Sequence, residues 1–158
     1  MSVKISILMG SKSDMPVMEH ASKVLDDFGV KYEVKVLSAH RTPKETVDYA
    51  EKLREKDIAV VICGAGMSAA LPGVVAAHTT LPVIGVPIDA STLNGMDALL
   101  STVQMPPGIP VGAVAIGKAG AKNAALLALR ILSLSEKSLE KKLEDFREEE
   151  RKKILNQK

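Results

Sequence analysis

The stretch Ala59-Val60-Val61-Ile62-Cys63 decides the fold class of this chain. It is a continuous apolar run with β-branched residues at its centre, and it ends where a glycine-rich segment begins at Gly64. An uninterrupted apolar run of this length is typical of a parallel strand that helices cover on both faces. Residues 4–9 and 81–87 form similar runs. The sequence therefore predicts a buried parallel sheet between two layers of helices.

Strands and helices alternate along most of the chain. The predicted strands cover residues 4–9, 31–37, 59–63, 81–87 and 111–116. A helical segment follows each strand; the first stops at Gly29, and the others begin near residues 43, 69–71, 96 and 117. This alternation predicts an α/β domain, a three-layer α/β/α sandwich around a doubly wound parallel sheet. Right-handed crossovers restrict the topology, and we expect the flavodoxin-like strand order 2-1-3-4-5.

The C-terminal segment differs from the rest of the chain. Ser133 and Glu136 have the spacing of a capping box, which predicts the start of a C-terminal helix. That helix is mostly charged and carries a sparse apolar stripe, made of Leu139, Leu143, Phe146 and Ile154. We expect residues 1–134 to form an α/β catalytic domain. We expect residues 135–158 to be a helical tail that packs on its own or a neighbouring subunit and is not a separate domain.

Composition excludes several classes of function. The chain has 158 residues, a formal net charge of +2 and 3% aromatic residues, which argues against a nucleic-acid-binding protein. The single cysteine, Cys63, excludes an internal disulfide, and its place in an apolar strand favours a core role over a catalytic thiol. The three histidines lie far apart without acidic partners at ligand spacing, so we expect no metal site. We expect neither a secretory signal nor a membrane span, and therefore a cytoplasmic protein.

Segments rich in glycine and hydroxyl residues directly follow the predicted strands. They cover residues 10–14, 38–42, 64–68, 89–92 and 117–120. In a parallel sheet the carboxyl ends of the strands meet at one edge, where ligands of such folds bind. The sequence therefore predicts one composite ligand site built from these loops.

The loop Ser38-Ala39-His40-Arg41-Thr42-Pro43 connects the second predicted strand to the following helix. Thr42 is placed to be the N-cap of that helix, and Pro43 fits the first helical position. Glu45 follows the N-cap by three residues, so the pattern predicts a capping box. His40 and Arg41 then lie just before a helix N-terminus, whose free N–H groups favour anions.

His40 and Arg41 are the side chains of this loop with the clearest chemical roles. The unperturbed pKa of histidine is about 6.5, so His40 suits proton transfer near neutral pH. Arg41 is placed to bind a phosphate through two hydrogen bonds. Of the other histidines, His20 lies within a predicted helix and His78 follows an alanine-rich helix, and we interpret both as structural. We therefore take His40 as the candidate general acid/base.

Two glycine-containing segments allow more than one interpretation. Residues 10–14 could hold a phosphate, but they lack the P-loop spacing, and N-capping by Ser13 or Asp14 explains them better when they are taken alone. Residues 64–69 match the dinucleotide fingerprint Gly-x-Gly-x-x-Gly/Ala, with Asp89 near the end of the next strand. The fingerprint follows the third strand rather than the first, and a tight turn with close helix packing accounts for its glycines at least as well.

Several segments of the chain recur together, in the same order, in one known family. They are Met9-Gly10-Ser11-Lys12-Ser13-Asp14, Ser38-Ala39-His40-Arg41-Thr42-Pro43, Gly64-Ala65-Gly66 with Leu71-Pro72-Gly73, Gln104-Met105-Pro106 with Gly108-Ile109-Pro110-Val111-Gly112, and Ala115-Ile116-Gly117-Lys118-Ala119-Gly120-Ala121 with Asn123-Ala124-Ala125. Together they closely resemble the bacterial 5-(carboxyamino)imidazole ribonucleotide mutases of purine biosynthesis, in older naming the carboxylase catalytic subunit. The resemblance covers residues 3 to about 134 and is highly specific.

The resemblance implies an isomerase that needs no cofactor. The substrate of this family is an imidazole ribonucleotide with a carbamate on its exocyclic nitrogen, and the product carries that carboxylate on the ring carbon. The family also implies a homo-octamer in which each site is built from more than one subunit. Such an enzyme would take no nucleic acid or membrane as a partner.

Carried over motif by motif, the resemblance assigns roles to named residues. His40 would be the acid/base. The substrate-binding residues come from three of the loops: Gly10, Ser11, Ser13, Asp14, Ser38, Arg41, Ala65 and Gly66. Among these, Ser11, Ser13 and Arg41 would hold phosphate or carboxylate, and Asp14 would bind the ribose hydroxyls. The pocket for the migrating carbon dioxide would be lined by Ser38, Ala65 and Gly66.

Two departures from the family pattern and two rival functions remain. Many relatives have a histidine where this chain has Ala70, and an arginine where it has Pro107. The nearest rival is a carboxylase that acts directly on aminoimidazole ribonucleotide and carbon dioxide, although residues 66–70 fit the mutase better. A more distant alternative is a non-catalytic nucleotide-binding module that uses residues 64–69 and Asp89.

Overall fold

The computed structural model describes residues 4–157, which form a five-stranded parallel sheet covered by helices. The strand order β2-β1-β3-β4-β5 confirms the flavodoxin-like prediction. The strands are β1 (Ile5–Met9), β2 (Tyr32–Val36), β3 (Val60–Gly66), β4 (Val83–Ile88) and β5 (Gly112–Ala113). The helices are α1 (Met15–Phe28), α2 (Pro43–Glu51), α3 (Leu71–Ala77), α4 (Met96–Val103), α5 (Gly117–Ser133) and α6 (Lys137–Leu155), with short 3₁₀ turns η1 (Lys12–Asp14) and η2 (Arg54–Lys56).

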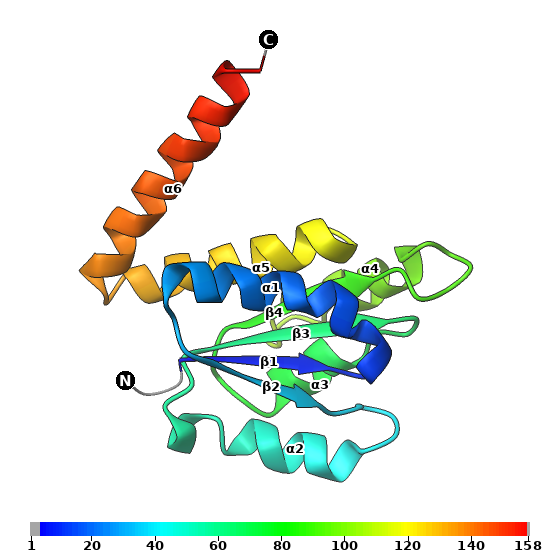
Figure 1. Cartoon of the computed structure of the whole chain (residues 1–158). Coiled ribbons are helices and arrows are strands. Elements are labelled where there is room, and N and C mark those ends of the chain that lie inside the picture. The colour runs from blue at the N-terminus through cyan, green and yellow to red at the C-terminus, as the bar shows by residue number, and fades with distance from the viewer. Residues whose placement is uncertain (1–3, 158) are drawn as a thin grey trace.

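The sheet separates two hydrophobic cores, as a three-layer sandwich requires. Helices α1 and α5 cover one face, and α2 and α3 lie on the other (Figure 1). Successive strand residues point to opposite faces. In β3, Val60 and Ile62 therefore pack toward α1 and α5, whereas Val61 and Cys63 pack toward α2 and α3. The apolar run predicted a strand buried on both faces, and the structure confirms it.

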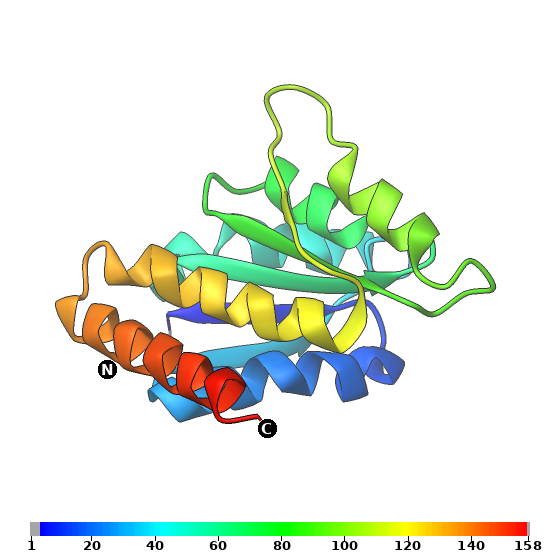
Figure 2. The same ribbon diagram turned by 90° about the horizontal axis from the view of Figure 1, so that it is seen from above.

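The first half of α6 packs on its own domain. Leu139 and Leu143 are buried in the same core cluster as residues of α1 and α5, and the ring centroid of Phe146 lies 5.8 Å from that of Phe28. Figure 1 shows α6 rising away from the layer of α1 and α5, and in the view from above (Figure 2) its far end lies in front of that layer. The second half lies away from the core, where Ile154 is 66% exposed. The apolar stripe therefore packs on this chain only through its N-terminal part.

The register of the strands places the ends of β1 and β2 and the C-terminal part of β3 side by side. Met9, the last residue of β1, pairs with Val36 of β2 and with Gly64 of β3. The chain therefore leaves β1 and β2 at the same edge of the sheet, beside the last residues of β3. Because the strands are parallel, this edge is the carboxyl edge at which such folds bind ligands.

Two strand ends differ from the sequence prediction by three residues, and the other boundaries by at most two. β3 does not end at Cys63 but continues through Gly66, because Gly64, Ala65 and Gly66 pair with the last residues of β4. Pairing with a neighbouring strand overrides the low strand propensity of glycine. β5 was predicted over residues 111–116 but holds only Gly112–Ala113, since just two residues pair with β4 at this edge of the sheet.

Neither predicted capping box forms. Thr42 is the N-cap residue of α2, but its side chain makes no cap hydrogen bond, because its Oγ1 is engaged by the backbone of Ser38. Ser133 lies inside α5 and donates to the carbonyl of Arg130. A hydroxyl group can bond to nearby backbone groups that a spacing rule does not consider. The capping box that does form is unpredicted, and it involves Ser11.

Candidate functional site

A cavity of 640 Å³ opens at the carboxyl edge of the sheet. All nine residues proposed from the sequence line it: Gly10, Ser11, Ser13, Asp14, Ser38, His40, Arg41, Ala65 and Gly66. They come from the loops that follow β1 and β2 and from the end of β3. The structure therefore brings the sequence-predicted site residues together around one cavity.

The His40 loop is closed by hydrogen bonds at Ser38. The backbone N–H of Arg41 donates to Ser38 Oγ at 3.1 Å, and the N–H of Thr42 donates to the Ser38 carbonyl at 2.9 Å. His40 lies within this turn, exposed to solvent at the rim of the cavity. Its imidazole is therefore accessible to a ligand, as proton transfer requires.

The guanidinium of Arg41 bridges the two loops that border the cavity. Its Nη2 donates to the carbonyl oxygen of Gly10 at 2.9 Å, and its Nε lies 3.4 Å from Ser38 Oγ. Anchoring at two points reduces the rotamer freedom that ligand binding would otherwise remove. The remaining N–H groups give this fixed positive charge the capacity to bind an anion.

The loop after β1 is held by a capping box at Ser11, where the sequence predicted ordinary N-capping by Ser13 or Asp14. Ser11 Oγ accepts the backbone N–H of Ser13 at 3.3 Å and the Ser13 hydroxyl at 2.9 Å. Asp14 Oδ2 accepts the N–H of Ser11 at 3.0 Å. Capping therefore centres on Ser11, and the loop presents two hydroxyls and one carboxylate toward the cavity.

Asp14 is a buried carboxylate at this edge. Burial raises the pKa of Asp14 above its ordinary value, although the N–H of Ser11, the charge of Arg41 and the N–H of Gly10 act in the opposite direction. Because the pKa is raised, keeping this side chain ionised near neutral pH lowers the stability of the folded protein. A buried carboxylate retained at such a cost is a candidate for ligand binding.

The glycines of the supposed dinucleotide fingerprint have a packing explanation. A β-carbon at Gly64 would collide with the side chain of Met18, and one at Gly66 would lie 2.6 Å from the β-carbon of Ala90. Both glycines belong to β3 rather than to a turn that opens a helix, which the dinucleotide motif requires. The structure therefore favours the packing interpretation over the dinucleotide site.

Some residues of the cavity were not identified from the sequence. They are Ala39, Met67, Ser68, Ala69, Ala70, Leu71 and Ala90. Ser68 lies in a loop already marked as rich in glycine and hydroxyl groups, which was the available signal. The small apolar side chains carried no signal of their own. Residues 117–120 were expected at the site, but they begin α5 and are not among the described residues that line this cavity.

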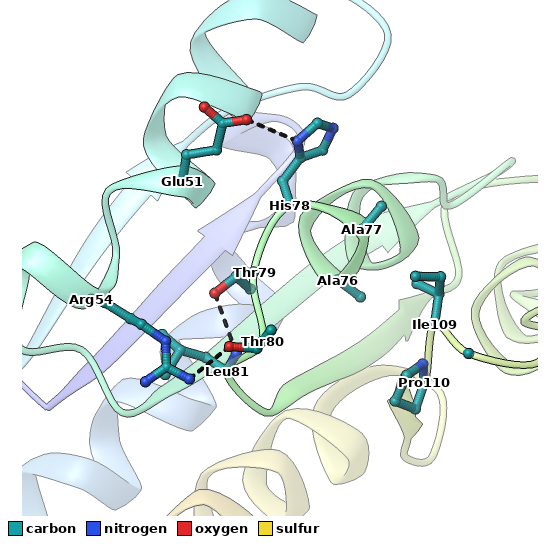
Figure 3. Close-up of a pocket in the computed structure, with 11 residues that line it drawn as sticks. Glu51, Arg54, Ala76, Ala77, His78, Thr79, Thr80, Leu81, Ile109 and Pro110 are labelled. Carbon is teal, nitrogen blue, oxygen red and sulfur yellow. Dashed lines mark hydrogen bonds and ion pairs between the residues drawn. The ribbon is translucent and has the colours of Figure 1, made fainter.

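A second cavity, of 660 Å³, lies at the opposite edge of the sheet, where α3 ends and β4 has not yet begun (Figure 3). Its charged side chains already make hydrogen bonds within the protein. His78 Nδ1 lies 3.2 Å from Glu51 Oε1, and Arg54 Nη2 donates to Thr80 Oγ1 at 2.7 Å. This edge is therefore the weaker candidate for catalysis, which agrees with a structural role for His78.

Other kinds of site find no support in the part of the chain that the structure describes. Cys63 is fully buried, and burial raises the pKa of its thiol far above the ordinary value, so it is not a nucleophile. Within residues 4–157 no cluster of three or more His, Cys, Asp or Glu side chains is suited to a metal ion. Over the same range no helix is long and apolar enough to cross a membrane.

Comparison with known proteins assigns the chain to a family. Residues 4–153 match the family described as AIR carboxylase. The chain belongs to the AIR carboxylase family. This assignment covers both the α/β domain and most of α6. It confirms the resemblance that the loop motifs indicated.

The curated relatives within the AIR carboxylase family carry a more specific name. A protein of Pyrococcus abyssi is 59% identical over 146 residues, covering 92% of this chain and 83% of its own length. A protein of Vibrio parahaemolyticus is 54% identical and one of Bacillus subtilis 55% identical, covering 97% and 96% of this chain and 95% and 93% of their own lengths. All three are named N5-carboxyaminoimidazole ribonucleotide mutase, which supports the mutase rather than the carboxylase.

Two solved structures have the same fold as this chain. A PurE2 variant of Treponema denticola superimposes with a TM-score of 0.88 at 33% identity, covering 98% of this chain and 95% of that one. Treponema denticola PurE superimposes with a TM-score of 0.86, also at 33% identity, with coverage of 96% and 93%. The three-layer architecture is therefore shared with these two PurE structures.

Proposed function

We propose that this chain is an isomerase of purine biosynthesis that converts 5-carboxyaminoimidazole ribonucleotide into 4-carboxy-5-aminoimidazole ribonucleotide. The observation that carries the proposal is the convergence of His40, Arg41 and Asp14 on one cavity at the carboxyl edge of the sheet. The mutase names of relatives at 51–59% identity support the same reaction. No cofactor is proposed, because the substrate brings its own carboxyl group and the accompanying proton transfers are within the capacity of a side chain.

His40 is the proposed proton carrier. A carbamate loses carbon dioxide readily once its nitrogen is protonated, and the amine that remains makes the ring carbon nucleophilic. After that carbon attacks carbon dioxide, a proton must leave it. One imidazole can perform both transfers, since it gives a proton to nitrogen and later takes one from carbon. Ala70 replaces a histidine that many relatives have, and His40 is the only imidazole that lines this cavity among the described residues.

The substrate would be held by the loops on either side of His40. Arg41 and the hydroxyls of Ser11 and Ser13 are proposed to bind the phosphate or carboxylate, since they combine a positive charge with neutral donors. Asp14 is proposed to accept hydrogen bonds from the ribose hydroxyls. Ser11, Ser13 and Asp14 follow β1 and Arg41 follows β2, so the ligand would span both loops.

The migrating carbon dioxide needs a small, dry pocket. Ser38, Ala65 and Gly66 are proposed to line it, with the backbone of Gly10 nearby. Small side chains leave room for a linear triatomic molecule and exclude bulk water, which would hydrate it. Retention of the gas close to the ring carbon favours recapture over escape.

We expect turnover of the carbamate substrate without added bicarbonate. Purified protein would be mixed with 5-carboxyaminoimidazole ribonucleotide in degassed buffer, and product formation would be followed by its ultraviolet absorbance. The direct carboxylase is the rival that the family description still suggests. Turnover that requires added bicarbonate and aminoimidazole ribonucleotide would support the carboxylase and overturn the mutase.

Replacing Asp14 by asparagine should separate stability from binding. Because the pKa of this carboxyl is raised in the folded chain, its contribution to stability is complete below the ordinary pKa and is lost as the pH rises through the folded value. At pH 7 Asp14→Asn should therefore unfold at the same or a higher temperature than the wild type. The variant should also have a KM raised at least about tenfold, because hydrogen bonds to a charged acceptor are lost. Thermal melts and kinetics measure the two effects, and an unchanged KM would remove Asp14 from the ribose contact.

The proposed assembly is a homo-octamer in the cytoplasm, with sites built from more than one subunit. A surface suited to self-association is the outer face of α4, where Met96, Leu100 and Val103 are each about half exposed. Light scattering on the purified protein is expected to give eight times the mass of one chain. A monomeric mass at micromolar concentration would contradict this assembly.

A further inference from the structure

Three donors converge on the backbone carbonyl of Ser38. Thr42 donates to it from its N–H at 2.9 Å and from its Oγ1 at 3.1 Å, and Thr46 donates from its Oγ1 at 3.2 Å. The N–H of Ser38 in turn donates to Thr42 Oγ1 at 2.9 Å. Two threonines one helical turn apart therefore hold both the amide and the carbonyl of Ser38.

Thr46 is different from an ordinary helical threonine. Its hydroxyl proton is shared between the Ser38 carbonyl and the carbonyl of Thr42, four residues earlier, at 2.8 Å. Thr102 in α4 makes only the second kind of bond, to the carbonyl of Ala98 at 2.7 Å. Both threonines are buried, with exposures of 0% and 1%. The bond that reaches out of the helix to Ser38 is thus the distinguishing feature of Thr46.

The hydrogen bond from Thr46 to the Ser38 carbonyl affects His40 because Ser38 closes the turn in which His40 lies. The Ser38 carbonyl accepts a hydrogen bond from the N–H of Thr42, and Ser38 Oγ accepts one from the N–H of Arg41, so both bonds enclose His40. Within residues 4–157 the imidazole of His40 has no hydrogen-bond partner of its own. Its position is therefore set by the backbone of the turn. Arg41, by contrast, keeps an independent anchor on the Gly10 carbonyl.

We propose that Thr46 is a positioning residue for His40, an inference that rests on the proposed function. Thr46 is fully buried and does not line the cavity, so it acts through Ser38 rather than by touching the substrate. Small displacements of a catalytic group lower the rate steeply. Loss of the Thr46 hydroxyl should therefore reduce kcat, whereas KM should change little because Arg41 remains anchored.

The test compares Thr46→Val, Thr46→Ser and Thr102→Val. Valine keeps the shape of threonine and removes the hydroxyl, and serine keeps the hydroxyl. Thr46→Val should lower kcat by about ten- to a hundredfold with KM changed less than about threefold. Thr46→Ser should retain kcat within about threefold of the wild type, and Thr102→Val should do the same.

Nuclear magnetic resonance of the histidine side chains gives a readout that does not need turnover. In protein labelled on histidine, the His40 signals should shift or broaden in Thr46→Val and remain in place in Thr46→Ser and Thr102→Val. The His20 and His78 signals should not move. Unchanged His40 signals in Thr46→Val would overturn the proposal, as would equal losses of kcat in Thr46→Val and Thr102→Val. If the wild type shows no mutase activity, the proposed function fails, and the His40 signals still decide whether Thr46 fixes the imidazole.

Discussion

Replacing His40 by asparagine is expected to lower kcat by a factor of about 10² to 10⁴, the usual contribution of a general acid/base. Asparagine is close to histidine in size but cannot exchange a proton near neutral pH. Both proposed transfers, to nitrogen and from carbon, depend on this one imidazole. The effect should therefore lie at the upper end of that range and should appear in steady-state kinetics with the carbamate substrate.

The matched control is His78→Asn. His78 is also exposed near a cavity of similar volume, but it lies at the opposite edge of the sheet and pairs with Glu51. We expect this variant to keep kcat within about twofold of the wild type. His40→Asn should still bind the product, because the phosphate contacts come from other residues. Retention of more than a tenth of the activity in His40→Asn would remove His40 from the acid/base role.

Replacing Gly120 by alanine is expected to lower the free energy of unfolding by about 3 kcal/mol or more, the upper end of the cost of overpacking. A β-carbon at Gly120 would overlap the carbonyl oxygen of Ala115 and lie 2.6 Å from its carbonyl carbon. Backbone atoms cannot rotate away as a side chain can. The gain in helix propensity, about 1 kcal/mol, does not offset this overlap. Urea denaturation followed by circular dichroism measures the effect.

Gly112→Ala is the control for this prediction. Gly112 lies in β5, is exposed, and a β-carbon there would lie 3.7 Å from the carbonyl oxygen of Val83, an ordinary contact. The free energy of unfolding should change by less than about 1 kcal/mol. A Gly120→Ala variant as stable as Gly112→Ala would show that α5 can move away from Ala115 without cost.

The fold was predictable because its strands carry an unambiguous pattern. Apolar runs such as residues 59–63 need cover on both faces, and glycine-rich loops after each strand mark the carboxyl edge. Strand ends were less predictable. β3 extends to Gly66 because it pairs with β4, and β5 is short because only two of its residues find a partner. Such pairing depends on residues distant in the sequence, which local propensity does not include.

The candidate site was predictable where charged or hydroxyl groups follow a strand. The cavity gathers all nine residues named for catalysis and substrate binding, including His40 and Asp14, but not the expected segment 117–120. The apolar lining, such as Ala90, carried no chemical signal in the sequence. The prediction of a capping box at Thr42 was wrong, because the Thr42 hydroxyl bonds to the backbone of Ser38 instead. That same competition creates the network around Thr46, which spacing alone did not indicate.

The central claim is that His40 faces the heterocycle of an imidazole ribonucleotide in the carboxyl-edge cavity. A crystal structure of the protein with aminoimidazole ribonucleotide tests it most directly. We predict the phosphate beside Ser11, Ser13 and Arg41, and a His40 ring nitrogen within about 3.5 Å of the exocyclic nitrogen or the reacting ring carbon. A ligand bound in the cavity at the opposite edge, or one whose ring points away from His40, would contradict the account.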